Sequence, residues 1–266
     1  MNIDALEHVE TNVQNRIARI VMNDPATLNA LTVDMMKEVN FLLDLYENDT
    51  EVRVIVLQGK GRAFSAGAKR EFLEDLPSMS KDDIQNIIYK HFAGGAKKIR
   101  NYSKPTVAAM RGAATGAGLE IALNCDFRIC TNDALLVETW IHLGLMDPLG
   151  GMALLPRLVG LTKANEMLLL GERVSGEEAE RIGLVNRAVD EEEFEETVDA
   201  FTARLADAAP LAIAAMKDGI RRGFEQSPDQ MADQNIEAQA TLVGTEDFKE
   251  GVAALFGKRK AHFKGQ

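Results

Sequence analysis

The sequence predicts an α/β fold in which helices cover a parallel sheet. Three short runs are predicted as strands, VRVIVLQG (52–59), PTVAAMRG (105–112) and DFRICTND (126–133). The first is nearly continuously apolar, as strands covered on both faces are. A small-residue turn and a helical pattern follow each of the first two, so the order strand, turn, helix, strand repeats. This order predicts βα units joined by right-handed crossovers.

The N-terminal part begins with an alternating strand pattern over residues 16–22, which Asp24-Pro25 interrupts. Thr32 is a plausible N-cap for the amphipathic helix that follows. Residues 76–90 are predicted as loop and then helix, and Pro105 ends that helical stretch. The predicted apolar face of the helix after Thr32 consists of Met35, Met36, Val39, Leu42, Leu43 and Tyr46.

The C-terminal part is predicted to be mostly helical from about residue 151. Ser175 is a plausible cap for one of these helices. The tail GKRKAHFKG is basic, in contrast to the acidic chain. We expect a core domain over residues 1–200 and a helical region over residues 201–266. The expected helices cover 151–171, 175–183, 192–209, 210–223 and 227–244.

Composition limits the classes of function. The 266 residues are 46% hydrophobic and 27% charged, which is ordinary for a globular protein, and the net charge of −11 argues against nucleic-acid binding. No apolar run approaches the roughly 18 residues of a membrane helix, and the N-terminus lacks the pattern of a signal peptide. Cys125 and Cys130 lack partners at metal-ligand spacing, so we expect buried free thiols, no metal site and a cytoplasmic location.

Two turns are rich in small residues, AFSAGAKREF (63–72) and GAATGAGLEIAL (112–123). Each follows a predicted strand and opens a helix, where backbone N–H groups lack helical partners and suit a developing negative charge. Ordinary tight turns are the alternative. Glu120 is either a surface residue on a first helical turn or a placed catalytic group. Dinucleotide binding does not fit, because the G-x-G-x-x-G spacing is absent.

Six segments, in this order and spacing, resemble the enoyl-CoA hydratase/isomerase (crotonase) family over essentially the full length. The resemblance implies a ββα spiral core like that of crotonase, with a helical C-terminal part that forms trimers or dimers of trimers. The segments are NDPATLNAL, VRVIVLQGKGRAFSAGA, KPTVAAMRGAATGAGLEIALNCDFRI, LGLMDPLGGMALLPRLVG, SGEEAERIGLVNRAV and EGVAALFGKRKAHFKG.

The resemblance also implies a site for an acyl-CoA thioester. The backbone N–H groups of Ala68 and Ala117 would bind the thioester carbonyl and stabilise its enolate. Residues 66–68 (Ala66, Gly67 and Ala68) would lie along coenzyme A, and Lys258 would contact its phosphates. Glu120 matches the first of the two catalytic glutamates of the hydratases. No cofactor beyond the coenzyme A of the substrate is expected.

The sequence departs from the family at the second glutamate, where the alignment places Trp140, the only tryptophan. Indole donates one hydrogen bond and cannot act as a base. Glu138 shares a face with Trp140 if the segment is extended, although a solvated loop acid is the ordinary interpretation. Asp147 is another possible acid, and an Asx-Pro turn is its ordinary interpretation.

Two further residues near these positions have ordinary explanations. A packed or partly exposed histidine is the simplest interpretation of His142. Lys69 stands where the family usually has aspartate, and a salt bridge to one of three nearby acids is the simplest interpretation. Those acids are Glu71, Glu74 and Asp75.

The sequence therefore predicts an enoyl-CoA hydratase/isomerase-type enzyme in which Glu120 is the acid/base. Because Trp140 replaces the second glutamate, decarboxylation or another enolate reaction is the alternative, and a coenzyme A-binding protein without turnover is a second one. We expect an acyl-CoA substrate, a homotrimer or homohexamer, and neither nucleic-acid nor membrane partners.

Overall fold

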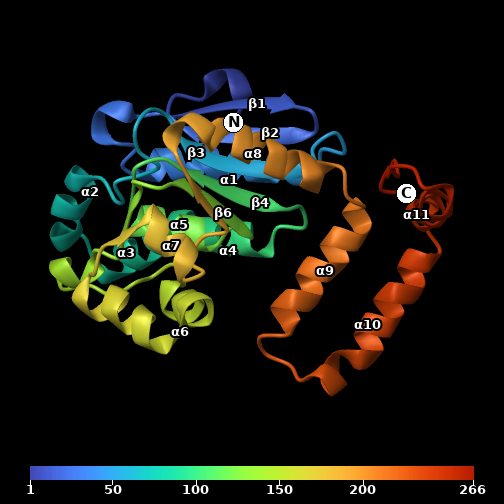
Figure 1. The fold of residues 1–266 in the computed structure, drawn as a ribbon. Helices are drawn as coiled ribbons and strands as arrows, with labels where there is room; N and C mark the ends of the chain where they lie inside the picture. The colour runs from blue at the N-terminus through green and yellow to red at the C-terminus, as the bar shows by residue number, and fades with distance from the viewer.

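The centre of the molecule is a six-stranded sheet in the order β1-β2-β3-β4-β6-β9 (Figure 1). The computed structural model describes residues 1–266, apart from the side chain of Tyr89. Every neighbouring pair is parallel except β1 and β2. The predicted parallel α/β arrangement is thus confirmed. The strands are β1 (Val9–Gln14), β2 (Ile17–Met22), β3 (Val54–Gly59), β4 (Thr106–Met110), β6 (Phe127–Thr131) and β9 (Arg187–Val189).

A smaller second sheet contains β5 (Ala113–Thr115), β7 (Leu135–Val137) and β8 (Val174–Ser175). A single bridge joins Ser65 to Ala114, so the segment after β3 lies beside this sheet. A strand of the main sheet, a short segment of this second layer and a helix therefore repeat three times along the chain. The stretch predicted as a glycine-rich turn before Ala117 is in part a strand, β5. The helices of the three repeats are α2 (Arg70–Asp75), α5 (Ala117–Leu123) and α6 (Gly151–Leu170).

The main sheet is covered on both faces, as its apolar strands require. Ile55 and Leu57 of β3 belong to the larger core cluster with α1 (Val33–Glu47). The alternate residues Val54 and Val56 pack against α8 (Glu191–Ala206) on the opposite face. The six predicted face residues of α1 are all buried. Two further helices, α3 (Lys81–Ile87) and α4 (Gly94–Asn101), lie on the α1 side, and α7 (Gly176–Arg181) follows β8.

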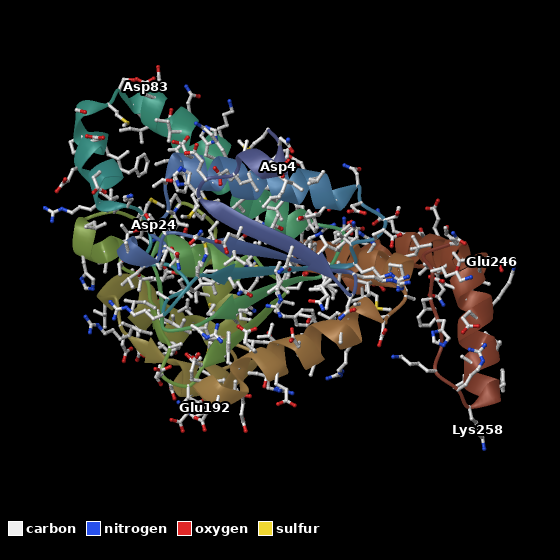
Figure 2. The ribbon with its side chains drawn as sticks, turned by 90° about the horizontal axis from the view of Figure 1, so that it is seen from above. Asp4, Asp24, Asp83, Glu192, Glu246 and Lys258 are labelled. Carbon is white, nitrogen blue, oxygen red and sulfur yellow. The ribbon has the colours of Figure 1, made fainter. Side chains whose placement is uncertain are left out.

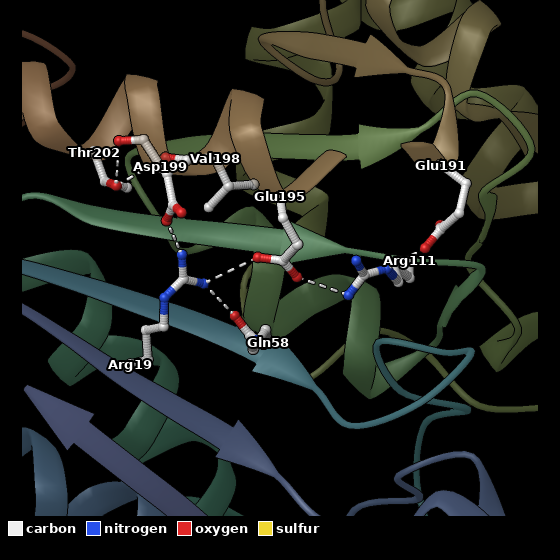
Figure 3. A network of polar contacts seen from close by, with 8 residues as sticks. All are labelled: Arg19, Gln58, Arg111, Glu191, Glu195, Val198, Asp199 and Thr202. Atoms are coloured by element: carbon white, nitrogen blue, oxygen red, sulfur yellow. Dashed lines mark hydrogen bonds and ion pairs between the residues drawn. The ribbon is translucent and has the colours of Figure 1, made fainter. Parts of the chain in front are cut away.

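Ion pairs add to the contact between α8 and the sheet (Figure 3). Arg19 of β2 donates to Gln58 Oε1 at 2.6 Å and pairs with Asp199 of α8. Arg111, which follows β4, donates to Glu195 of α8 at 2.8 Å. Several of these groups are partly exposed, so we assign the network a role in orienting α8 rather than a large share of stability.

The C-terminal helices α9 (Pro210–Arg222), α10 (Pro228–Val243) and α11 (Glu246–Gly257) extend to one side of the sheet (Figure 1). Lys217 of α9 holds this arm to the body, because it donates to Lys104 O at 2.7 Å and pairs with Asp126. The arm exposes large apolar side chains that this chain leaves uncovered. They are Leu211, Met216, Ile220, Phe224, Ile236, Val243, Phe248, Val252, Leu255 and Phe256.

The predicted caps and cysteines agree with the structure. The Thr32 and Ser175 side chains accept from Met35 N–H at 3.1 Å and from Glu178 N–H at 3.2 Å. The two cysteines are buried free thiols. Within the described residues, no helix combines the length and the apolar content needed to cross a bilayer. The strands β1, β7, β8 and β9 and the helix α11 were not anticipated, as most are short or strongly polar.

Candidate active site

The segment after β3 passes directly beside the segment after β4. Leu31 N–H donates to Gly67 O at 2.7 Å, and Thr115 N–H donates to Ser65 O at 3.0 Å. These bonds hold the first small-residue turn between its neighbours like a strand in a sheet. Both turns lie at the carboxyl ends of parallel strands, where α/β sheets commonly bind ligands.

The first turn of α5 approaches this segment closely. A Cβ at Gly118 would lie 2.7 Å from Ser65 Cβ, so only glycine permits the approach. The N–H groups of Ala68 and Ala117 have no hydrogen-bond partner within the described part of the chain. Each turn therefore offers a free backbone donor, and the pairing of the two donors on one carbonyl oxygen stays a prediction.

Glu120 lies on α5, one turn after Gly116, and is 0% exposed. Its Oε2 accepts from Leu149 N–H at 2.9 Å, while Oε1 has no partner among the described residues. Burial raises the pKa of Glu120 to about 12, and the neighbouring carboxyl group of Asp147 adds to the rise. The Trp140 indole lowers the pKa of Glu120. Burial therefore favours the neutral form of Glu120, and Glu120 is not a surface carboxylate.

Asp147 lies in the loop before α6 and is buried. Its Oδ1 accepts from Leu149 N–H at 2.8 Å and from Gly150 N–H at 3.1 Å, and its Oδ2 accepts from Met152 N–H at 2.7 Å. These bonds resemble the predicted turn, but the same Leu149 N–H also serves Glu120. The turn thus places a second carboxyl group against Glu120. Three backbone N–H groups donate to this carboxyl group.

Glu138 follows β7 and is 1% exposed. Burial, and then the charge of Asp147, raise the pKa of Glu138 well above its usual range. Neither of its carboxyl oxygens has a partner in the described structure. The interpretation of Glu138 as a solvated loop acid was therefore wrong, because the loop folds inward beneath α6. Glu138, Asp147 and Glu120 form one buried group of three, which we call the carboxyl cluster.

Trp140 begins a short 3-10 helix (Trp140–Leu143) that follows Glu138. Its side chain packs against the main core, and its indole N–H is buried without a partner among the described atoms. A Cβ at Gly116 would lie 4.0 Å from Trp140 Cε2, which places the ring beside the start of α5. Trp140 therefore brings a hydrogen-bond donor, and no base, to the neighbourhood of Glu120.

His142 and Lys69 are directed elsewhere. The His142 side chain is exposed, and its ring packs on Gly171 at the end of α6. The contact is close: a Cβ built on Gly171 would lie 2.3 Å from His142 Nε2. Lys69 pairs with Asp24 at 3.4 Å, so the expected salt bridge to Glu71, Glu74 or Asp75 was wrong. Neither side chain pairs with a member of the carboxyl cluster.

Lys258 lies far from residues 66–68, although both were expected to contact the same molecule of coenzyme A. It is exposed beyond the end of α11, and Figure 2 shows it at the opposite end of the molecule from Asp24, which pairs with Lys69. Ala66, Gly67 and Ala68, by contrast, lie on the turn itself. Within one chain, the structure does not bring Lys258 together with residues 66–68.

The residues that hold the loop before α6 were not predicted from the sequence. Asn124, one turn after Glu120, donates to Leu149 O at 3.1 Å and accepts from Arg100 at 2.9 Å. Its spacing of four residues from Glu120 on one helix was the available signal. Asn124 thereby fixes the backbone N–H of Leu149 that Glu120 and Asp147 share.

The arrangement suits proton transfer next to a carbonyl group. One unpartnered backbone N–H lies at the start of α5 and a second on the neighbouring turn, and an acid with a raised pKa lies one turn further along α5. The described residues contain no group of three or more histidine, cysteine or carboxylate side chains placed to hold a metal ion.

Comparisons with known proteins show which family the chain resembles. The family model described as Enoyl-CoA hydratase/isomerase matches residues 12–266. A short-chain-enoyl-CoA hydratase of Clostridium acetobutylicum is 32% identical over 256 residues, which are 96% of this chain and 97% of that protein. A crotonyl-CoA hydratase of Syntrophomonas wolfei is 32% identical over 260 residues, 97% of this chain and 98% of that protein. The crystal structure of an enoyl-CoA hydratase from Polaromonas sp. superposes with a TM-score of 0.92 at 27% identity, covering 96% and 99% of the two chains.

Proposed function

The chain belongs to the enoyl-CoA hydratase/isomerase family, and from this membership we propose that the carboxyl cluster exchanges protons with the enolate of a coenzyme A thioester. The chain is an acyl-CoA-processing enzyme with the crotonase-like fold of that family. The observation that carries the finer proposal is the burial of Glu120, 0% exposed, one turn beyond the unpartnered N–H of Ala117.

The thioester carbonyl would accept hydrogen bonds from the N–H groups of Ala68 and Ala117. Both donors lack partners within the described chain, and they come from adjacent turns that hydrogen bonds hold together. Negative charge that develops on the carbonyl oxygen would be stabilised there, typically by about 3 kcal/mol for each donor. The enolate is thus the intermediate that the site is built to hold.

Glu120 would supply the proton that the α carbon takes. As water adds to the β carbon, the electrons of the double bond move toward the thioester carbonyl, and the neutral carboxyl group of Glu120 gives its proton to the α carbon. The resulting Glu120 carboxylate accepts the proton that the added water loses, or the proton that the γ carbon loses when a double bond moves. The proton balance closes in either case, and Glu120 returns to its acid form.

Decarboxylation is the second candidate, and Trp140 favours it. A hydratase of the usual type positions water between two carboxyl groups, and indole cannot take the place of one of them as a base. Loss of carbon dioxide forms the enolate without a base, and neutral Glu120 would then protonate that enolate. This reaction needs only one acid.

Product analysis separates these reactions. Purified protein is incubated with crotonyl-CoA and with methylmalonyl-CoA, and the thioesters are analysed by mass spectrometry. A gain of water supports hydration, and a loss of carbon dioxide supports decarboxylation.

Glu120→Gln is expected to abolish turnover while coenzyme A binding stays within about threefold. The exposed Glu192→Gln is the matched control. Equal rates for wild type and Glu120→Gln would exclude Glu120 as the catalyst, and no product from any thioester would favour a binding protein.

Coenzyme A would lie along Ala66, Gly67 and Ala68. Since Lys258 lies at the other end of its own chain, we propose that it contacts the phosphates of coenzyme A bound to a neighbouring copy.

The exposed apolar side chains of the C-terminal arm support assembly into a trimer or hexamer. No cofactor other than the coenzyme A of the substrate enters the proposed reactions.

A further inference from the structure

We propose that Asn124 is a positioning residue of this site, because it holds the backbone of the residue whose N–H anchors one carboxyl oxygen of Glu120. Arg100 in turn orients the Asn124 amide. The second oxygen of Glu120, Oε1, is thereby left as the atom that exchanges protons with the substrate. This inference deepens the proposed function and rests on it, since it specifies how Glu120 is aimed. We assign Asn124 no contact with the substrate.

The anchor of the Glu120 carboxyl group is a single backbone donor. Glu120 Oε2 accepts from Leu149 N–H at 2.9 Å, and Oε1 has no partner among the described residues. The same N–H donates to Asp147 Oδ1 at 2.8 Å. Because Glu120 is 0% exposed, bulk water cannot replace its bond to Leu149. The position of the Leu149 backbone therefore decides where the Glu120 carboxyl group lies.

Asn124 holds that backbone from the end of α5. It is 4% exposed, and its Nδ2 donates to Leu149 O at 3.1 Å and to Glu120 O at 2.8 Å. The two N–H groups of one amide thus tie the loop before α6 to the helical turn that carries Glu120. A single rigid group thereby sets the distance between the anchor and the acid that it holds.

The end of α5 supplies an ordinary explanation for this asparagine, but an incomplete one. Asn124 is the C-cap of α5, and its own backbone N–H bonds to Glu120 O at 3.2 Å. Such a cap needs only local contacts. The bond from Nδ2 to Leu149 O instead reaches a carbonyl 25 residues away in sequence. Capping does not explain that bond, whereas positioning of the loop does.

Arg100 decides which end of the Asn124 amide faces the loop. Its Nη1 donates to Asn124 Oδ1 at 2.9 Å, so the amide nitrogen is turned to the two carbonyl oxygens. A reversed amide would place oxygen against oxygen and nitrogen against the guanidinium, which loses every one of these bonds. The guanidinium also lies close to the turn, because a Cβ at Gly150 would be 3.1 Å from Nη1. Three segments therefore meet at Asn124: the last turn of α4, the end of α5 and the loop before α6.

The direction of the Glu120 carboxyl group matters because proton transfer requires close approach to the substrate carbon. A displacement of about 1 Å can cost about a hundredfold in rate. Without the two Asn124 donors, the Leu149 backbone is free to move away from α5, and Oε1 loses its fixed direction. Coenzyme A is proposed to lie along residues 66–68, on the other turn. The loss should therefore appear in kcat and leave KM unchanged.

Kinetics with two different substitutions test this role. Asn124→Asp keeps an acceptor for Arg100 and loses both donors, and Asn124→Leu loses the same donors without adding a charge. Both should lower kcat at least about tenfold, with KM within about twofold of wild type. Asn40→Asp is the control, because Asn40 donates to His91 O at 3.0 Å, away from the loop, and its kcat should stay within about twofold.

Three kinetic results would overturn the proposal. They are an unchanged kcat in both Asn124 variants, a loss confined to KM, and a loss in Asn124→Asp alone, which would assign the effect to the added charge. Arg100→Met leaves the amide in place without its orienting donor and should lower kcat about threefold. If both Asn124 variants fail to fold, the kcat of Arg100→Met decides, and a wild-type value would contradict the positioning role.

Hydrogen exchange tests the anchor without any turnover. The Leu149 N–H, followed by mass spectrometry of peptide fragments, should exchange at least about tenfold faster in Asn124→Leu than in wild type, and at the wild-type rate in Asn40→Asp. An unchanged rate in Asn124→Leu would show that Asn124 does not hold this donor, and the proposal would be wrong. If wild type turns over no thioester, the proposed function fails, and the exchange rate alone decides whether Asn124 holds the anchor.

Discussion

Replacing Glu120 by glutamine is expected to stabilise the folded protein, and to do so more at high pH. Glutamine copies the neutral acid closely: its oxygen can accept from Leu149 N–H, and its amide can donate to Asp147. The variant thus keeps the contacts of the buried group and removes its titration. A stability gain from a catalytic substitution is expected where a site holds a group in an unfavourable environment.

The sign follows from the shift of the pKa. Burial raises the pKa of Glu120 from 4.5 to about 12, so the folded state keeps a proton that the unfolded chain loses above its own pKa. The protonated Glu120 contributes its full stabilisation of the folded state below the pKa of the unfolded chain. This stabilisation is lost progressively as the pH rises toward the pKa of Glu120 in the folded state. The loss is about 1.4 kcal/mol per pH unit, or about 2.7 kcal/mol between about pH 6 and pH 8. Glutamine shows no such loss.

The measurement is urea unfolding of wild type, Glu120→Gln and the exposed control Glu192→Gln at these two pH values. All samples need one protein concentration, because assembly shifts apparent stability. The free energy of unfolding of Glu120→Gln minus that of wild type should grow by about 2.7 kcal/mol from the lower to the higher pH. If this difference is the same at both values, Glu120 is ionised in the folded state and the assignment of a neutral acid is refuted.

Three further substitutions test neighbouring parts of the site. Gly151→Ala places a Cβ 2.0 Å from Asp147 Oδ2 and should lower kcat about tenfold and stability by about 2 kcal/mol, as measured by kinetics and unfolding. Gly257→Ala is its control, with ordinary contacts at 3.8 Å, and equal effects would argue against displacement of Asp147. Trp140→Glu should raise crotonyl-CoA hydration at least about tenfold, and a folded variant without this gain would contradict the need for a second base. Lys258→Ala should weaken coenzyme A binding to the assembled protein about fivefold in calorimetry, and unchanged affinity would remove Lys258 from the site.

The sequence predicted most of the main sheet because local pattern decides those elements. The apolar runs that became β3 and β4 need only be covered on both faces, and the face of α1 follows from helical spacing. The two small-residue turns were equally accessible, since such turns after strands leave backbone donors free. Family resemblance added the positions of the two donors, Ala68 and Ala117, and their pairing, which stay predictions.

The carboxyl cluster could not be predicted in the same way. Asp147 and Glu138 occur in a segment whose composition suits a surface turn, and their burial depends on how the start of α6 meets α5. That contact depends on Asn124 and a shared backbone N–H, which no local pattern encodes. The partner of Lys69 was missed for the same reason, because Asp24 is distant in sequence and near in space.

The site divides its chemistry between main chain and side chains, and this division has a consequence for how the enzyme can evolve. The donors that we propose for the thioester, at Ala68 and Ala117, and the Leu149 donor to Glu120 are peptide N–H groups, which every substitution except proline preserves. The side chains at Glu138 and Trp140 can therefore change during evolution while the backbone donors proposed to bind the enolate remain. New reactions are open to such a scaffold through single codon changes, while the ability to bind the thioester is inherited intact.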